Sequence, residues 1–193
     1  MPMTAPIILT LIRIGLVPVM VLFFYLPFSW SNLAAVIVFV SAAMTDWMDG
    51  YIARRTGQLT RFGAFLDPFA DKLMVATALV VLLQQNPRLP FALAAAIIIG
   101  REITISALRE WMAELGQTGI VKVSRTAKLK TIFQMTSISF LLYRQDIGPL
   151  PIAFMGEILL YLAAGLTIWS MWVYLHSAWP VMSEHAHSGD FRD

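Results

Sequence analysis

Four aspartates are the residues best suited to chemistry in this 193-residue chain. Asp46 and Asp49 occur in "TDWMDG", and Asp67 and Asp71 occur in "RFGAFLDPFADK". Clustered carboxylates without histidine or cysteine favour a hard cation such as Mg²⁺, Mn²⁺ or Ca²⁺. Two divalent ions would balance the four negative charges, so the sequence predicts a metal site.

The surroundings of these aspartates are those of an integral membrane protein. The chain is 58% hydrophobic and only 13% charged, whereas about a quarter of the residues of a soluble domain are charged. There is no cysteine, which excludes disulfides and thiolate chemistry. An unpaired charge in the bilayer costs roughly 2.5–3.5 kcal/mol, so the four aspartates need cationic partners.

Six apolar segments are long enough to predict an all-α protein with six transmembrane helices, since a span needs about 20 residues. We expect them at about 7–28, 31–53, 62–83, 89–111, 124–143 and 152–172, the last with a C-terminal end between 172 and 176. Residues 1–176 would form one catalytic membrane domain. Residues 177–193 would form a polar tail, disordered over 183–193.

The predicted helices bring the aspartates together. Asp46 and Asp49 are one helical turn apart, and Gly63, Asp67 and Asp71 recur every four residues, so each set shares a helix face. A short loop makes the second and third helices antiparallel neighbours. The alternative is a set of salt bridges to nearby cations, which are Arg54, Arg55, Arg61 and Lys72.

The basic residues predict the orientation. Nine lie on the side of the termini and the long loops, and two lie on the other side. The positive-inside rule then puts both termini and the aspartates in the cytoplasm.

The motif Asp46-x2-Asp49-Gly50-x2-Ala53-Arg54-x8-Gly63-x3-Asp67-x3-Asp71 resembles the signature of the CDP-alcohol phosphatidyltransferase family at every position. Further stretches, such as "REITISALREWMAELG", extend the resemblance over almost the whole chain. It implies that Asp46, Asp49 and Asp67 hold divalent Mg²⁺ or Mn²⁺, two ions per site, and that Asp71 is the base and also contacts a metal. It also implies a cytidine diphosphate pocket lined by Gly50, Ala53, Arg54 and Gly63.

The resemblance further implies the fold of this family and a homodimer in the bacterial inner membrane, surrounded by lipid and without a nucleic-acid partner. It implies transfer of a phosphatidyl group from CDP-diacylglycerol to sn-glycerol 3-phosphate, with release of CMP. Other alcohols fit the motif alone, and only the whole-chain resemblance selects glycerol 3-phosphate. An intramembrane prenyltransferase and a cation transporter are the alternatives from other classes.

The acceptor phosphate needs cations of its own. The candidates are Arg101, Arg109, Lys128 and Lys130. Arg101 is the most informative, because a mid-membrane arginine is a functional residue by default. The alternatives are an internal pair of Arg101 with Glu102 or an aspartate, a surface pair of Arg109 with Glu110, and a purely topological role for the two lysines.

Overall fold

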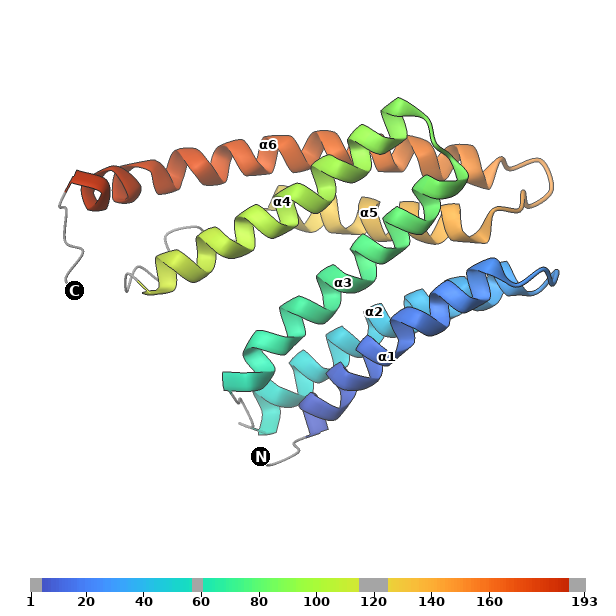
Figure 1. Ribbon diagram of the computed structural model, residues 1–193, viewed down its shortest axis with the longest axis horizontal. Helices are drawn as coiled ribbons and strands as arrows, with labels where there is room; N and C mark the ends of the chain where they lie inside the picture. The colour runs from blue at the N-terminus through green and yellow to red at the C-terminus, as the bar shows by residue number, and fades with distance from the viewer. Residues whose placement is uncertain (1–4, 57–60, 115–124, 188–193) are drawn as a thin grey trace.

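The computed structural model describes residues 5–56, 61–114 and 125–187, and it describes side chains for residues 7–45, 63, 66–112, 129–177 and 179. Six helices make up these ranges (Figure 1). They are α1 (Ala5–Tyr25), α2 (Ser31–Thr56), α3 (Arg61–Gln85), α4 (Leu89–Glu114), α5 (Arg125–Tyr143) and α6 (Ile152–His187). The predicted all-helical fold is confirmed.

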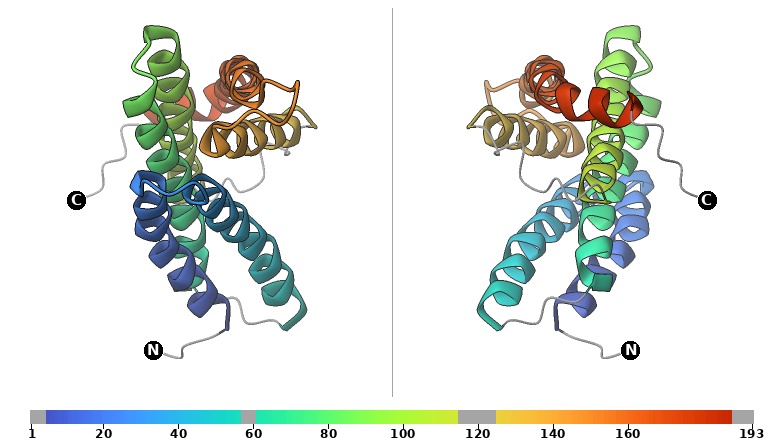
Figure 2. Two further views of the ribbon diagram at one scale, coloured as in Figure 1. Left: turned by 90° about the vertical axis from the view of Figure 1, so that its right-hand side faces the viewer. Right: turned by 90° about the vertical axis from the view of Figure 1, so that its left-hand side faces the viewer.

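Helix α3 lies at the centre of the bundle, where it packs against α1, α2, α4 and α5. The pairs α1–α2 and α5–α6 form hairpins on either side of it, and α4 also packs against α6 (Figure 1). Figure 2 shows α2 leaning away from α1 and α3 towards its C-terminal end, the part of α2 that carries Asp46 and Asp49. The aspartate motif is thus distributed over two helices that diverge.

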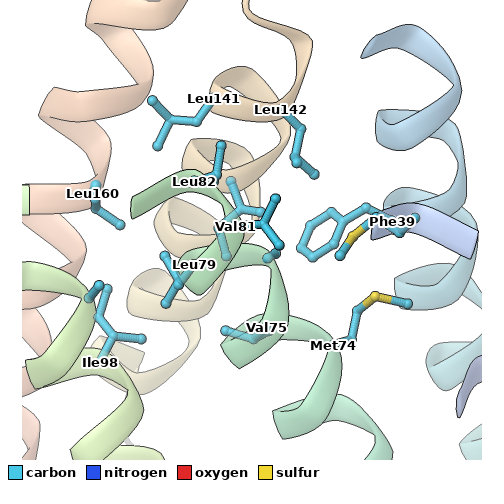
Figure 3. Packing of buried hydrophobic residues seen from close by; sticks show 14 of the residues in the cluster. Phe39, Met74, Val75, Leu79, Val81, Leu82, Ile98, Leu141, Leu142 and Leu160 are labelled. Atoms are coloured by element: carbon cyan, nitrogen blue, oxygen red, sulfur yellow. The ribbon is translucent and has the colours of Figure 1, made fainter. Parts of the chain in front are cut away.

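The larger of the two apolar clusters among the described residues joins all six helices (Figure 3). It forms because α3 presents a buried stripe at helical spacing, including Met74, Val75, Ala78, Leu79 and Leu82. Neighbouring helices add the buried side chains Phe39, Ile98, Leu142 and Leu160. This core fixes α3, and therefore the aspartates near its N-terminal end.

Polar contacts fix the opposite end of the bundle. Glu157 on α6 accepts hydrogen bonds from Asn86 Nδ2 at 2.6 Å and from Arg88 Nη2 at 2.8 Å. Gly148 has a φ of 59° in the turn between α5 and α6, a left-handed conformation that suits glycine. The polar contacts therefore join the α3–α4 loop to α6, at the end of the bundle opposite to the aspartates.

Three of the described helices contain stretches long and apolar enough to cross a membrane, namely Ile7–Tyr25, Leu89–Met112 and Ile152–Ser177. The chain is a membrane protein by this measure and by its composition. Helix α2 has a shorter apolar stretch, Ser31–Thr45, and α3 and α5 carry charged residues at one end. That these three also span the membrane stays a prediction.

The predicted helix bounds agree with the structure to within three residues, except at the C-terminus. Residues 183–187 were expected to be disordered, but they are the last residues of α6. That expectation is wrong because it relied on polar composition, and helix propensity does not require apolar residues. The rest of the predicted tail, 188–193, lies outside the described residues.

Candidate functional site

Helix α1 contacts both aspartates of α3. The hydroxyl of Thr10 donates a hydrogen bond to Asp67 Oδ1. One turn further along α1, Arg13 Nη1 donates to Asp71 Oδ1 at 2.8 Å, forming an ion pair. Both pairs lie in the α1–α3 interface. Because α1 carries no residue of the aspartate motif, the two carboxylates are held by side chains from outside that motif.

The Arg13 side chain is only 1% exposed, whereas that of Asp71 is 38% exposed. The guanidinium is therefore enclosed by the helices while the carboxylate still faces open space. Arg13 stands within the first apolar run of the sequence, but it was not among the residues predicted for the site. The available signal was the charge itself, since an arginine inside a membrane helix requires an anion.

The two aspartates whose side chains are described, Asp67 and Asp71, have the ligand chemistry that a hard divalent cation requires. Asp67 and Asp71 lie one turn apart on the same face of α3, and both are partly exposed. They offer only oxygen donors, which Mg²⁺ and Mn²⁺ prefer. Among the described side chains no group of three or more candidate ligands forms. The other two aspartates of the motif, Asp46 and Asp49, have side chains that lie outside the described residues.

The motif residues predicted to bind the nucleotide are located only in part. Gly50, Ala53 and Arg54 belong to helix α2, but their side-chain environment lies outside the described residues. Gly63 is buried near the start of α3, one turn before Asp67. The structure thus places Gly63, Asp67 and Asp71 along one face, as their spacing predicts.

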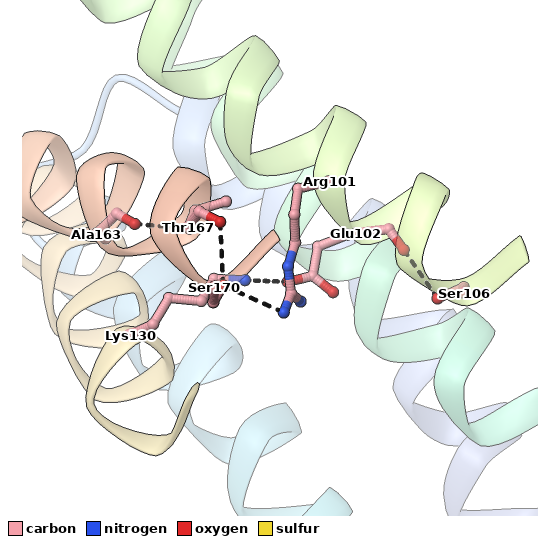
Figure 4. Close-up of polar contacts among 7 residues, drawn as sticks. All are labelled: Arg101, Glu102, Ser106, Lys130, Ala163, Thr167 and Ser170. Carbon is pink, nitrogen blue, oxygen red and sulfur yellow. Dashed lines mark hydrogen bonds and ion pairs between the residues drawn. The ribbon is translucent and has the colours of Figure 1, made fainter. Parts of the chain in front are cut away.

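A second polar cluster forms where α4, α5 and α6 converge (Figure 4). Glu102 Oε1 accepts from Lys130 Nζ, and it lies 3.4 Å from Arg101 Nη1. Arg101 Nη2 donates to Ser170 Oγ at 3.4 Å. The internal pair with Glu102, which was the alternative to an acceptor-binding role for Arg101, is therefore present, and Lys130 shares the same carboxylate.

This cluster is strongly buried. The side chains of Lys130 and Arg101 are 3% and 12% exposed, and that of Glu102 is 26% exposed. The Nε of Arg101 has no hydrogen-bond partner among the described residues. Two buried cations thus share one carboxylate, which leaves an excess of positive charge able to attract an anion.

A pocket of about 520 Å³ lies between α3 and α4, beside Arg101 and Glu102 of the second cluster. From α3 it is lined by Pro68, Phe69 and Lys72, each within two residues of Asp67 or Asp71 in the chain. From α4 it is lined by Arg101, Glu102, Ile105, Ser106, Arg109 and Glu110. Arg109 is exposed and faces this pocket, whereas the side chain of Lys128, on α5, lies outside the described residues. Two predicted acceptor cations therefore share one pocket.

An apolar groove of about 400 Å³ lies between α2 and α5. Its lining is mainly hydrocarbon, from Phe39, Val40, Ala43, Met44 and Met135, with the hydroxyls of Thr136 and Ser139. Met44 ends the apolar part of α2, two residues before Asp46. The groove therefore leads along the membrane helices towards the aspartate end.

Sequence comparison identifies the class of protein. The family model for CDP-alcohol phosphatidyltransferase matches residues 3–169. The chain therefore belongs to the CDP-alcohol phosphatidyltransferase family, and the family resemblance expected from the aspartate motif is confirmed. Membership also argues against the transporter and prenyltransferase alternatives.

Relatives of nearly equal length carry one common name, CDP-diacylglycerol–glycerol-3-phosphate 3-phosphatidyltransferase. The protein of Yersinia pestis (strain Pestoides F) is 51% identical over 184 residues, covering 95% of this chain and 100% of that protein. The protein of Pseudomonas fluorescens is 52% identical, covering 92% and 91%. The protein of Shigella flexneri serotype 5b (strain 8401) is 50% identical, covering 92% and 96%.

The shared carboxylate of Glu102 yields a stability prediction. Glu102→Gln should destabilise the fold, because breaking a buried ion pair leaves an uncompensated charge at a cost of roughly 3–5 kcal/mol. Adding Lys130→Met should recover much of this loss, since it removes one of the two orphaned cations. Thermal unfolding of the purified protein in detergent measures both effects. Additive losses in the double variant would contradict the shared-carboxylate arrangement.

Proposed function

We propose that this chain transfers a phosphatidyl group from CDP-diacylglycerol to sn-glycerol 3-phosphate and releases CMP. The observation that carries the proposal is 51% identity, over 95% of this chain, to a protein named for that reaction. The geometry supports it from two sides. A carboxylate edge on α3 suits a metal-bound diphosphate, and a cationic pocket beside it suits a second phosphate.

The donor diphosphate would bind at the aspartate end. Asp46, Asp49, Asp67 and Asp71 would hold two divalent ions, Mg²⁺ or Mn²⁺. When bound, these ions would neutralise negative charge on the diphosphate oxygens. Gly50, Ala53, Arg54 and Gly63 would line the cytidine diphosphate pocket, where small residues let the nucleotide approach the backbone.

Asp71 would act as the base. The acceptor hydroxyl oxygen forms a bond to the phosphorus that bears the diacylglycerol group. The bond from that phosphorus to the bridging oxygen breaks, and CMP leaves with the electron pair. The hydroxyl proton passes to the carboxylate of Asp71, whose 38% exposure leaves it accessible. A positioned base contributes about 10²–10⁴-fold to such a rate.

The acceptor phosphate would bind Arg101 and Arg109 in the 520 Å³ pocket, with Lys128 and Lys130 nearby on α5. The unpartnered Nε of Arg101 supports this assignment, because a buried donor gains from meeting an anion. Lys72, on the α3 wall of the same pocket, lies next to Asp71 in the chain. This would bring the acceptor hydroxyl towards the proposed base.

A lipid donor explains the groove between α2 and α5. We assign its occupant as one acyl chain of CDP-diacylglycerol, because the lining is apolar and leads towards the aspartate end of α2. Cytidine diphosphate would then stay in water while the diacylglycerol stays in the bilayer. The proposed setting is a homodimer in a bacterial inner membrane, with six spans in residues 1–176. The site, both termini and the tail 177–193 would face the cytoplasm.

The reaction is tested by CMP release from the purified chain. With CDP-diacylglycerol and Mg²⁺, release should require sn-glycerol 3-phosphate and should fail with inositol phosphate or serine. EDTA should abolish it, Mg²⁺ or Mn²⁺ should restore it, and Asp67→Asn should not respond to either ion. Release of CMP with another alcohol but not with sn-glycerol 3-phosphate would overturn the assignment of the acceptor. No release with any acceptor would overturn phosphatidyl transfer.

Arg101 gives a second prediction about the acceptor. Arg101→Ala should raise the KM for sn-glycerol 3-phosphate about tenfold or more, because a charge-assisted hydrogen bond to phosphate contributes roughly 1.5–3 kcal/mol. The KM for CDP-diacylglycerol should change little. Arg88→Ala, which removes a cation at the opposite end of the bundle, is the matched control. Equal changes in both KM values would show that Arg101 is structural.

A further inference from the structure

Thr10 and Arg13 belong to no part of the aspartate motif, yet each contacts one of its carboxylates. Thr10 has no exposed surface, and Arg13 has 1%. A buried hydroxyl and a buried guanidinium are costly unless they are hydrogen-bonded. Their partners are therefore required by the fold as well as by the site.

The spacing of the two contacts fixes one register between the helices. Thr10 and Arg13 are three residues apart on α1, and their partners Asp67 and Asp71 are four residues apart on α3. Both pairs are separated by about one helical turn, a rise of about 5.4 Å. Sliding α1 by one turn would leave at least one buried polar group without its partner.

We propose that Thr10 and Arg13 are positioning residues that hold Asp67 and Asp71 in the orientation needed to bind a divalent cation. The inference rests on the proposed metal role of these aspartates. Hydrogen bonds to a ligating carboxylate orient its oxygens, and removing such a partner typically weakens metal binding about 10–100-fold. Both side chains are buried and thus closed to substrate, so both would act through the carboxylates.

The sign of the effect at Arg13 separates positioning from competition. If Arg13 were only a positive charge competing with the cation for Asp71, its removal would strengthen metal binding, since like charges repel. If it orients Asp71, its removal weakens binding despite the loss of repulsion. Thr10 carries no charge, so Thr10→Val reports on orientation alone.

The experiment measures Mn²⁺ binding to the full chain in lipid nanodiscs, with free Mn²⁺ followed by electron paramagnetic resonance. We expect Thr10→Val and Arg13→Gln each to raise the Kd for Mn²⁺ about tenfold or more. Thr10→Ser keeps the hydroxyl, so its Kd for Mn²⁺ should stay near that of the wild type. Arg13→Lys keeps the positive charge but loses the planar guanidinium group. Its Kd for Mn²⁺ should therefore lie between those of the wild type and Arg13→Gln.

Two matched controls separate this effect from general damage to the fold. Thr167→Val makes the same change at another fully buried threonine, whose hydroxyl donates to the carbonyl of Ala163 at 2.6 Å. Arg88→Gln breaks an ion pair of the same 2.8 Å length at the other end of the bundle. Both should bind Mn²⁺ as the wild type does.

An unchanged or lower Kd for Mn²⁺ in Thr10→Val and Arg13→Gln would overturn the inference while leaving the metal site in place. If Arg13→Gln fails to fold, the comparison of Thr10→Val with Thr10→Ser decides. Failure of the wild type to bind Mn²⁺ at all would instead overturn the proposed metal site, and the inference with it. The two failures are therefore distinguishable on one set of preparations.

Discussion

The ion pair between Arg13 and Asp71 is the constraint on which the site end of the molecule depends. A guanidinium that is 1% exposed among apolar helices must meet an anion. The nearest turn of α3 supplies that anion, which ties α1 to α3 at one register. Because α3 also carries the centre of the apolar core, the pair places the aspartates relative to the whole bundle. A carboxylate that we propose takes part in the chemistry thus also stabilises the fold.

Charge is divided between two neighbouring regions of the site. The carboxylates of Asp67 and Asp71 lie on α3, whereas the cations Arg101 and Lys130 lie on α4 and α5 around Glu102. A reaction between two phosphate-bearing substrates needs such a division. In the proposed function, one phosphate group would be held through metal ions on the carboxylates, and the other would be held directly by basic side chains. The pocket between α3 and α4 is lined by Arg101 and Glu102 and, on α3, by residues that neighbour Asp67 and Asp71 in the chain.

Local patterns made most of the fold predictable. Helix bounds followed from apolar runs and from breaks such as the polar stretch around Asn86, and the α3 face followed from the four-residue spacing of Gly63, Asp67 and Asp71. Contacts between distant segments could not be predicted in this way. Arg13 and Asp71 are 58 positions apart, and Arg101 and Ser170 are 69 apart. Their pairing depends on how the helices pack, which spacing along one helix does not reveal.

The most direct test of this account is a crystal structure of the protein with Mn²⁺ and CDP-diacylglycerol, with the metal located by anomalous scattering. The account predicts a manganese peak about 2.1 Å from carboxylate oxygens of Asp67 and Asp71, a length typical of small divalent ions. It also predicts that Thr10 and Arg13 still contact those carboxylates from α1. A manganese peak away from α3, or an Arg13 side chain displaced from Asp71 by the metal, would contradict it.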